Sequence, residues 1–360
     1  MVDITRRQLL QAGAAVGGLL LVGACSDEAA PPTEAPDAVE APTLDELVTA
    51  SQSEGGDMLW YLPGQADTAK ALQDGFKAAY PWTNARVENL TFRDLPNKLI
   101  TEAITQAPTA DVFMLPRTFR ETMLQNEVVV PVKLPADDAM PQDLLDPEPY
   151  SHPCYILLIS MIYNTNALPG GPPDPKALAT PAWSKKLAFD RVQSLGQSTI
   201  WLSSWRNQWG SSDWVKWLDG LKANEVFITA TGGDTYAAVL RGERPIGFGS
   251  SNDINAQAPG TPMAADYTIP PVPFIQNLWL TKNAAHPATG KLFMNWALSE
   301  DGQKAFAATG RSPALQTIDS PISVTSLLPP ETKLLSGAEL QDFYASTGEY
   351  LSILGAKWPG

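Results

Sequence analysis

Residues 57–63 read DMLWYLP and residues 67–80 read DTAKALQDGFKAAY, and these two stretches decide the fold class. The first is a short apolar run that ends in a Pro-Gly turn, which is typical of a buried strand. In the second, Leu72, Phe76 and Tyr80 recur every four residues and therefore share one face of a helix. A strand followed directly by an amphipathic helix is the building unit of a parallel sheet.

The same alternation continues toward the C-terminus. Residues 85–90 (ARVENL) and 110–115 (ADVFML) indicate two further strands, and residues 94–107 indicate the helix between them. After the apolar run at residues 154–164, a second set of strands and helices is predicted at residues 185–190, 198–209, 212–224, 234–243 and 245–249. The sequence therefore predicts an α/β protein of two lobes, each a mainly parallel sheet flanked by helices.

The N-terminal segment has the order of parts of an export signal. Thr5–Leu10 reads TRRQLL, an apolar stretch of about eleven residues follows, and Val22–Cys25 reads VGAC. The apolar stretch is shorter than the ~20 residues that span a bilayer as a helix. TRRQLL resembles a twin-arginine (Tat) signal and VGAC resembles a bacterial lipobox, which implies that residues 1–24 are removed and that Cys25 is lipidated. The alternative is a Sec signal in which the two arginines only supply positive charge.

The composition indicates how the chain is organised after the signal and which partners it has. Residues 25–43 are rich in Pro, Ala and acidic side chains, so we expect a disordered tether behind the lipid anchor. The formal net charge of −14 argues against nucleic acid and anionic lipid as partners. Cys154 is the only cysteine besides Cys25, so no disulfide is expected within the folded part. The remaining residues, roughly 315, are enough for two domains.

Three longer segments resemble one family of transport proteins. They are residues 174–189 (DPKALATPAWSKKLAF), 240–253 (LRGERPIGFGSSND) and 283–314 (NAAHPATGKLFMNWALSEDGQKAFAATGRSPA). In this order and at these spacings they are similar to the family 1 extracellular solute-binding proteins of ABC importers, particularly the branch around the ferric-iron-binding proteins. The resemblance runs from about Leu59 to Pro313.

The resemblance implies a type II periplasmic binding protein, a clamshell whose two lobes are joined by two hinge crossings. Lobe one would comprise residues 44–153 and 271–360, with the last segment as a helix that closes back on it. Lobe two would comprise residues 154–270. The resemblance also implies a non-catalytic protein without a cofactor. It would be a monomeric lipoprotein on the outer face of the cytoplasmic membrane, which captures a small solute and delivers it to the permease subunits of an ABC transporter.

Ligands of open parallel sheets bind beyond the carboxyl ends of the strands, so the loops at these ends predict the site. Gln65 and Asp67 follow the first strand, although Asp67 could equally cap the next helix. Arg117 follows the third strand, where it could bind a carboxylate or phosphonate or be an ordinary surface charge. The other candidates begin the helix at 198–209 or follow the strand at 245–249, and they are Gln197, Ser198, Thr199, Trp201, Ser250, Ser251 and Asn252.

Two of these candidates have a second interpretation. The helix start around Ser198 offers free N–H groups and the positive end of the helix dipole to an anion, unless Ser198 is simply the N-cap. Trp201 begins a stripe of tryptophans at helical spacing, a pattern more typical of a core. Because Trp201 lies in the first helical turn, it could also form the floor of the cleft.

The loop at Ser250-Ser251-Asn252 bears on the ligand. Ferric-iron-binding members of the family carry adjacent tyrosines at this point, so we expect a small polar, anionic solute in place of Fe³⁺. No metal site is expected, because His152 and His286, the only histidines, each precede a proline as loop residues do. A ferric-iron or other metal-binding protein of an ABC importer is the alternative. An envelope hydrolase is a further alternative, but the sequence lacks the motifs Gly-x-Ser-x-Gly and His-Glu-x-x-His that such enzymes carry. A sensor or scaffold lipoprotein, which would reuse the same fold, is the last alternative.

Overall fold

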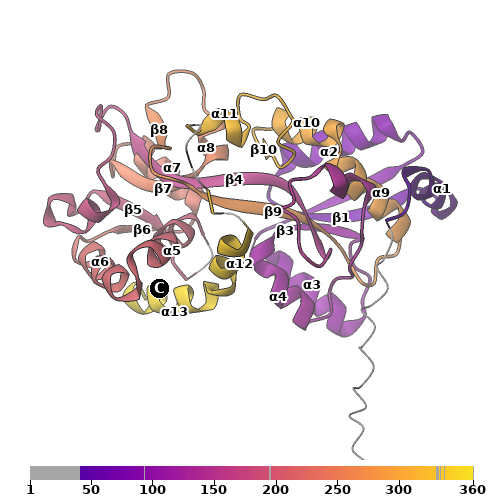
Figure 1. Ribbon diagram of the computed structural model, residues 1–360, viewed down its shortest axis with the longest axis horizontal. Coiled ribbons are helices and arrows are strands. Elements are labelled where there is room, and N and C mark those ends of the chain that lie inside the picture. The colour runs from indigo at the N-terminus through magenta and orange to yellow at the C-terminus, as the bar shows by residue number, and fades with distance from the viewer. Residues whose placement is uncertain are drawn as a thin grey trace, which may run out of the picture. The chain divides into compact units, whose positions relative to one another are not determined.

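The computed structural model in Figure 1 describes residues 41–359, except residues 93, 194, 195, 330, 331, 333 and 336. The chain divides into two units, Met1–Ala38 and Val39–Gly360, and the described residues belong to the second unit. The predicted signal, the lipidation site at Cys25 and most of the tether lie outside the described residues. Within the described part, no helix is both long and apolar enough to cross a bilayer.

Strands and helices alternate in the order that the sequence predicts. The first part of the chain contains α1 (Leu44–Glu54), β1 (Asp57–Pro63), α2 (Ala66–Ala79), β2 (Asn84–Leu90), α3 (Asp94–Thr105), β3 (Val112–Pro116), η1 (Arg117–Phe119), α4 (Arg120–Gln125), η2 (Pro135–Ala139) and β4 (Ser151–Asn164). The middle part contains η3 (Pro175–Ala179), η4 (Pro181–Trp183), β5 (Leu187–Asp190), α5 (Gln197–Trp209), α6 (Ser211–Ala223), β6 (Phe227–Thr229), α7 (Gly232–Leu240), β7 (Ile246–Ser250), α8 (Ser251–Asn255) and β8 (Met263–Asp266). The last part contains β9 (Val272–Leu280), α9 (Pro287–Leu298), α10 (Glu300–Ala308), β10 (Ser312–Pro313), α11 (Val324–Leu327), α12 (Gly337–Ala345) and α13 (Thr347–Lys357).

All strands of the described residues join one sheet, whose main order is β2-β1-β3-β9-β4-β7-β5-β6. Strands β1, β2 and β3 are parallel at one end, and β5, β6 and β7 are parallel at the other. Between these ends, β9 and β4 run antiparallel to each other and to their neighbours. The sequence analysis expected a separate sheet in each lobe. The two ends are instead continuous, because β4 has 14 residues and is long enough to pair at both ends (Figure 1).

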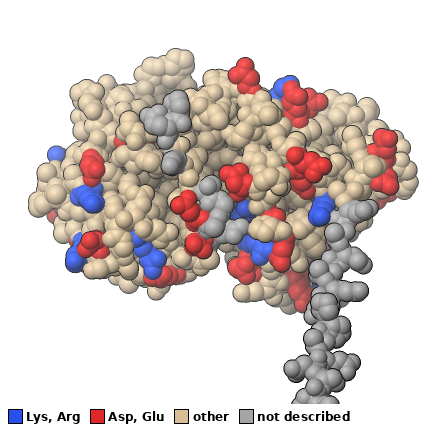
Figure 2. Space-filling view, in the orientation of Figure 1, with Lys and Arg blue, Asp and Glu red and all other residues tan. Residues whose placement is uncertain are grey.

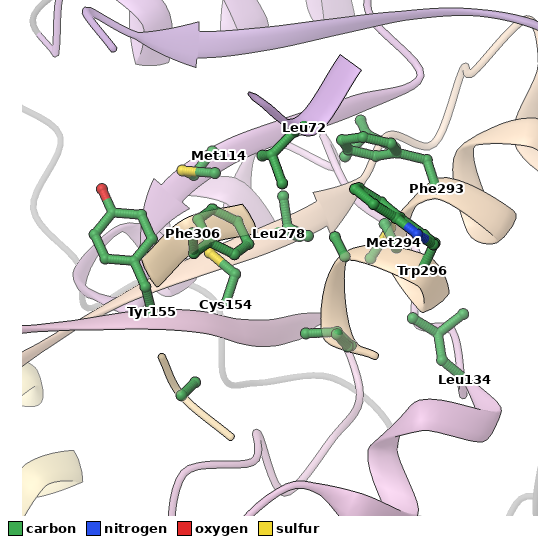
Figure 3. Close-up of a cluster of buried hydrophobic side chains, with 14 of the residues drawn as sticks. Leu72, Met114, Leu134, Cys154, Tyr155, Leu278, Phe293, Met294, Trp296 and Phe306 are labelled. Atoms are coloured by element: carbon green, nitrogen blue, oxygen red, sulfur yellow. The ribbon is translucent and has the colours of Figure 1, made fainter. Parts of the chain in front are cut away.

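Each parallel end has its own hydrophobic core. The first cluster, shown in part in Figure 3, joins the first end to α2, α9 and α10 and includes Leu72, Met114 and Phe293. The second cluster joins the other end to α5 and α6 and includes Trp201 and Phe248. The two ends of the sheet therefore have separate hydrophobic clusters within one compact unit, Val39–Gly360.

The C-terminal segment differs from the expectation of one helix that closes back on lobe one. It forms α12 and α13, and α13 packs against α5 and α6. Tyr350, Leu354 and Trp358 are buried in the second cluster. For α13 the expectation was wrong because aromatic contacts decide its packing: Tyr350 meets Trp214, and Trp358 meets Phe189. Leu340 of α12, by contrast, is buried in the first cluster, as the expectation required.

Charged side chains of both signs are interspersed on the face shown in Figure 2. Many of the ion pairs are exposed, for example Lys70 with Asp74 and Lys216 with Asp213. Exposed pairs of this kind contribute little to stability, typically ~0–1 kcal/mol. The buried clusters therefore hold the fold together.

Candidate functional site

A first polar group lies where α2 begins, after the carboxyl end of β1. The Nε2 atom of Gln65 donates a hydrogen bond of 2.7 Å to the hydroxyl of Tyr155, while its Oε1 atom is buried without a partner. Tyr155 lies on β4, and burial raises the pKa of its phenol. Figure 3 shows the Tyr155 ring beside Phe306, with the hydroxyl pointing out of the hydrophobic cluster. A buried phenol and a buried amide therefore meet at this strand end.

An arginine adds charge to this position. Arg311, just before β10, contacts Asp67 with both terminal nitrogens, at 2.9 and 3.4 Å. The arginine side chain is 14% exposed, whereas the aspartate side chain is 60% exposed. Burial is the largest cause of the raised pKa of Tyr155; the charge of Asp67 also raises this pKa, whereas the charge of Arg311 lowers it. Gln65, Asp67, Tyr155 and Arg311 are called the Tyr155 group below.

A second polar group lies at the carboxyl ends of β5 and β7. The carboxylate of Asp253 accepts hydrogen bonds from the Ser250 hydroxyl at 2.8 Å and from the Gln197 amide at 3.2 Å. The Oε1 atom of Gln197 is buried without a partner, and a Cβ on Gly232 would lie 2.3 Å from it. Glycine at that position therefore lets the starts of α5, α7 and α8 approach one another. Gln197, Ser250 and Asp253 are called the Asp253 group.

The two groups face a common region beside β4. Ser250 pairs with Ile159 of β4, four residues beyond Tyr155, which separates the groups by about 13 Å at the usual strand rise. Helix α8 reaches the turn after α10 through a bond of 3.5 Å from the Asn255 side chain to the Gly310 carbonyl.

Several residues of these two groups and their neighbours have buried polar atoms without a partner, as do residues elsewhere in the described part of the chain. Most buried polar groups in proteins are hydrogen-bonded, so a ligand could supply the missing partners at the candidate site. Gln276 of β9, opposite Tyr155 in the ladder, is fully buried, and neither atom of its amide has a partner. The unpartnered atoms of this region belong to Gln65, Gln197, Asn252, Gln257, Gln276, Arg311 and Ser312.

Arg117, the predicted anion anchor, is directed elsewhere. Its terminal nitrogens donate to the carbonyl oxygens of Leu144 and Leu145, and the residue is 6% exposed. Burial lowers the pKa of its guanidinium. Arg117 is therefore not a surface charge. Because the turn η1 aims its guanidinium at a neighbouring loop, we do not include it in the candidate site.

Four other candidates use their side chains within the fold. Ser198 and the buried carboxylate of Asp190 bond to each other through both side chains and backbone N–H groups, at 2.7 and 3.0 Å. The Thr199 hydroxyl donates to a carbonyl of the preceding loop, and the Ser251 hydroxyl accepts from the backbone of β4. Trp201 stacks on Phe248 at 4.2 Å in the second cluster and is 1% exposed, so it belongs to the core and is not the floor of a cleft. Of the predicted residues, Gln65, Asp67, Gln197, Ser250 and Asn252 remain at the candidate site.

Four site residues were missed by the sequence analysis: Tyr155, Asp253, Gln276 and Arg311. Asp253 and Arg311 stand in two segments that carried the family resemblance, directly after the loop at Ser250 and within the final Gly-x-x-P turn. Tyr155 and Gln276 lie inside apolar runs, where a polar side chain gives no periodic signal.

The histidines have structural partners. Nδ1 of His152 lies 2.7 Å from a carboxylate oxygen of Asp137, and Nδ1 of His286 lies 3.4 Å from Asp111. Among the described residues, no group of three or more His, Cys, Asp or Glu side chains could hold a metal ion.

A scan of family models matches residues 71–328 to the bacterial extracellular solute-binding proteins. The match covers more than half of the chain, so this protein belongs to that family. Members are non-catalytic binding components of ABC importers in the bacterial envelope. The comparison with curated proteins gave no match.

Solved structures show the same fold at low sequence identity. Iron-bound HitA from Pseudomonas aeruginosa is 17% identical, with a TM-score of 0.69 over 84% of this chain and 99% of that one. AfuA from Actinobacillus pleuropneumoniae, with fructose-6-phosphate bound, is 17% identical, with a TM-score of 0.69 over 84% of this chain and 97% of that one. The Trichodesmium protein IdiA (FutA), in complex with iron and citrate, is 17% identical, with a TM-score of 0.68 over 84% and 99%.

Proposed function

We propose that this protein captures a small hydroxylated solute with one anionic group, such as a sugar phosphate, between two lobes that close around it. The proposal rests on the arrangement of one arginine and several buried amide groups without partners, those of Gln65, Gln197 and Gln276, at the ends of neighbouring strands. Amide side chains and hydroxyl groups are the usual means of fixing a polar ligand in an otherwise apolar site.

The charges at the site give the solute an orientation. Arg311 is the cation of the Tyr155 group. Its partner Asp67 is mostly exposed, so water can solvate the Asp67 carboxylate when an anionic group of the solute replaces it on the guanidinium. The Asp253 group carries a carboxylate, which suits the hydroxyl end of the solute, because a carboxylate only accepts hydrogen bonds. The phosphate would thus lie near Arg311 and the hydroxyl groups near Asp253.

Ferric iron is the second candidate. Iron is present in two of the similar structures, and Tyr155 offers one phenol close to the carboxylate of Asp67. The loop at Ser250-Ser251-Asn252 has no tyrosine, however, so any iron would need an accompanying anion to complete its ligands.

Titration calorimetry separates the candidates. We expect fructose 6-phosphate or another sugar phosphate to bind, and ferric citrate to bind weakly or not at all. Arg311→Ala should weaken sugar-phosphate binding about tenfold to hundredfold, since a charged hydrogen bond contributes ~1.5–3 kcal/mol. The control is Arg241→Ala, an exposed arginine directly after α7 that pairs with Glu243. Tight ferric binding, or equal affinities in the two variants, would overturn the proposal.

The attachment to the membrane is part of the same proposal. Cys25 would carry the lipid and residues 25–43 the tether, so that the lobes, 44–153 with 271–360 and 154–270, stay close to the permease as a monomer. At about 18 residues the tether reaches roughly 25 Å as a flexible coil, enough for docking beside the anchor.

A further inference from the structure

The edge of β9 is open where the chain passes from the first parallel end to the second. Strand β3 pairs with β9 from Leu280 back to Gln276 and ends there at Pro116. Beyond this point β9 pairs with β4 on one edge only. The carbonyl of Pro273 and the N–H of Ile275 point to the other edge, because C=O(i) and N–H(i+2) share one side of a strand.

The hydroxyl of Tyr344 occupies this open edge. It donates to the Pro273 carbonyl at 3.3 Å and accepts from the Ile275 N–H at 3.5 Å. A single phenol therefore takes the place of the ladder partner that β3 no longer provides. Burial raises the pKa of Tyr344 to about 12, against the opposing effects of the bond from Ile275 and the charge of Arg117. The hydroxyl thus stays protonated and able to donate near neutral pH.

The helix that follows Tyr344 is fixed to the second cluster. Glu349 of α13 accepts two hydrogen bonds from Arg206 of α5, at 2.8 and 3.0 Å. Lys357, also on α13, forms an ion pair with Asp219 of α6. Together with the buried rings of Tyr350 and Trp358, these contacts tie α13 to α5 and α6.

The other side of α12 meets the first parallel end. Helix α12 contacts η1, and the charge of Arg117 in η1 acts on Tyr344. Figure 1 shows α12 below β9, between the α4 side and the α5 side, with α13 running under α5 and α6. The C-terminal helices therefore pass from the second cluster to the hinge strand and touch the beginning of η1.

We propose that α12 and α13 form a hinge strap, and that Tyr344 is the positioning residue that fixes β9 to it. The inference rests on the proposed function, in which the lobes move about β4 and β9. With the hydroxyl in place, the strap limits the orientations of the ligand-free lobes, so fewer unproductive states compete with closure. Without it, residues 273–275 have no partner on one edge, and the lobes sample a wider range.

Spin labels on the two ends test this without any ligand. Ile104→Cys on α3 is 70% exposed, and Ser212→Cys on α6 is also exposed, whereas Cys154 is buried and will not be labelled. The full chain carries Cys25→Ser, and the distance distribution between the labels is measured by double electron–electron resonance. Tyr344→Phe should widen this distribution about twofold. The matched control is Tyr350→Phe, whose hydroxyl is buried without a partner, and it should leave the width unchanged.

A second measurement reports the bond itself. Hydrogen exchange of the Ile275 amide should become about threefold to tenfold faster in Tyr344→Phe and stay unchanged in Tyr350→Phe. An unaltered distance distribution in Tyr344→Phe, or equal broadening in both variants, would overturn the strap. Both measurements are made without solute, so they test the strap even if the protein does not bind sugar phosphates. Conversely, a widened distribution together with no binding of any sugar phosphate would support the strap and reject the ligand class.

Discussion

Two buried glutamines close to Cys154 should respond in opposite directions to the same substitution. Gln276 and Gln303 are both fully buried. Neither amide atom of Gln276 has a partner, whereas Gln303 donates to the carbonyls of Cys154 and Ala297, each at 2.9 Å, and accepts from the Leu315 N–H at 3.0 Å. Methionine has a similar length and no amide, so it isolates the contribution of the amide group.

The expected magnitudes follow from these contacts. Burying an unpartnered amide costs about 1–3 kcal/mol in proteins, so Gln276→Met should raise the free energy of unfolding by about 1–2 kcal/mol. Gln303→Met removes three hydrogen bonds and leaves their backbone partners unsatisfied, so it should lower this free energy by about 3 kcal/mol. For a folded part of roughly 320 residues, the melting temperature should rise by about 1–3 °C in the first variant and fall by about 4–5 °C in the second.

Calorimetric melting of protein that has been unfolded and refolded, so that no solute remains bound, measures both shifts. Sugar-phosphate affinity should fall in Gln276→Met, because stability gained at a binding site usually comes with lost function. A lower melting temperature for Gln276→Met would refute the reasoning, since it would mean that the amide has a stabilising partner in the free protein. Unchanged affinity would remove Gln276 from the site.

Three further predictions concern single positions. Arg117→Met should lower the free energy of unfolding by about 1–3 kcal/mol and leave solute affinity unchanged, because its guanidinium bonds two backbone carbonyls; lost affinity at wild-type stability, measured by calorimetry, would contradict this. Burial raises the pKa of Asp190 in the folded state, so its contribution to stability falls as pH rises above the ordinary aspartate value. Asp190→Asn should therefore be more stable than wild type at pH 7, with a smaller advantage near pH 4; an advantage that grows on acidification would show the opposite shift. Lys at both Arg6 and Arg7 should block export of the folded protein if the signal is of the Tat type, and Cys25→Ser should abolish lipidation; normal membrane-bound levels of either variant in fractionated cells would reject that assignment.

The regular elements could be predicted because their signals are local. Leu72 and Phe76 recur at helical spacing and are buried on α2, and the strands at β1, β3, β5 and β7 are short apolar runs between turn signals. Strand β9 was missed, because its polar residues Gln276 and Asn277 and its proline interrupt the pattern of a buried strand. The continuity of the sheet depends on how β4 and β9 pair, which is a property of residues more than 100 positions apart.

The sequence predicted which residues lie at strand ends, but it did not predict the direction of their side chains. Gln65 follows β1 and Ser250 is the last residue of β7, so both lie at the strand ends that the sequence predicts. Whether a side chain at such an end faces a ligand depends on partners elsewhere in the chain. The carbonyls that hold Arg117 come from residues 27 and 28 positions away, and no local pattern reveals them. The partner of Ser198 could have been predicted. Asp190 ends a strand eight residues before Ser198, and an aspartate there is well placed to accept the free N–H groups at the helix start.

The helix starts of the second parallel end bear directly on the charge of the solute. A free helix start favours an anion, and this was the reason to expect one near Ser198. In the structure, the carboxylate of Asp190 already accepts the Ser198 N–H, and the carboxylate of Asp253 caps α8 while holding Gln197. The N–H groups at these two helix starts therefore already bind the carboxylates of Asp190 and Asp253. An anionic ligand placed there would be repelled by these carboxylates. Under the proposed function, the anionic group of the solute therefore binds on the other side, near Arg311 at the carboxyl end of β1, and its hydroxyl groups bind to the acceptors around Asp253.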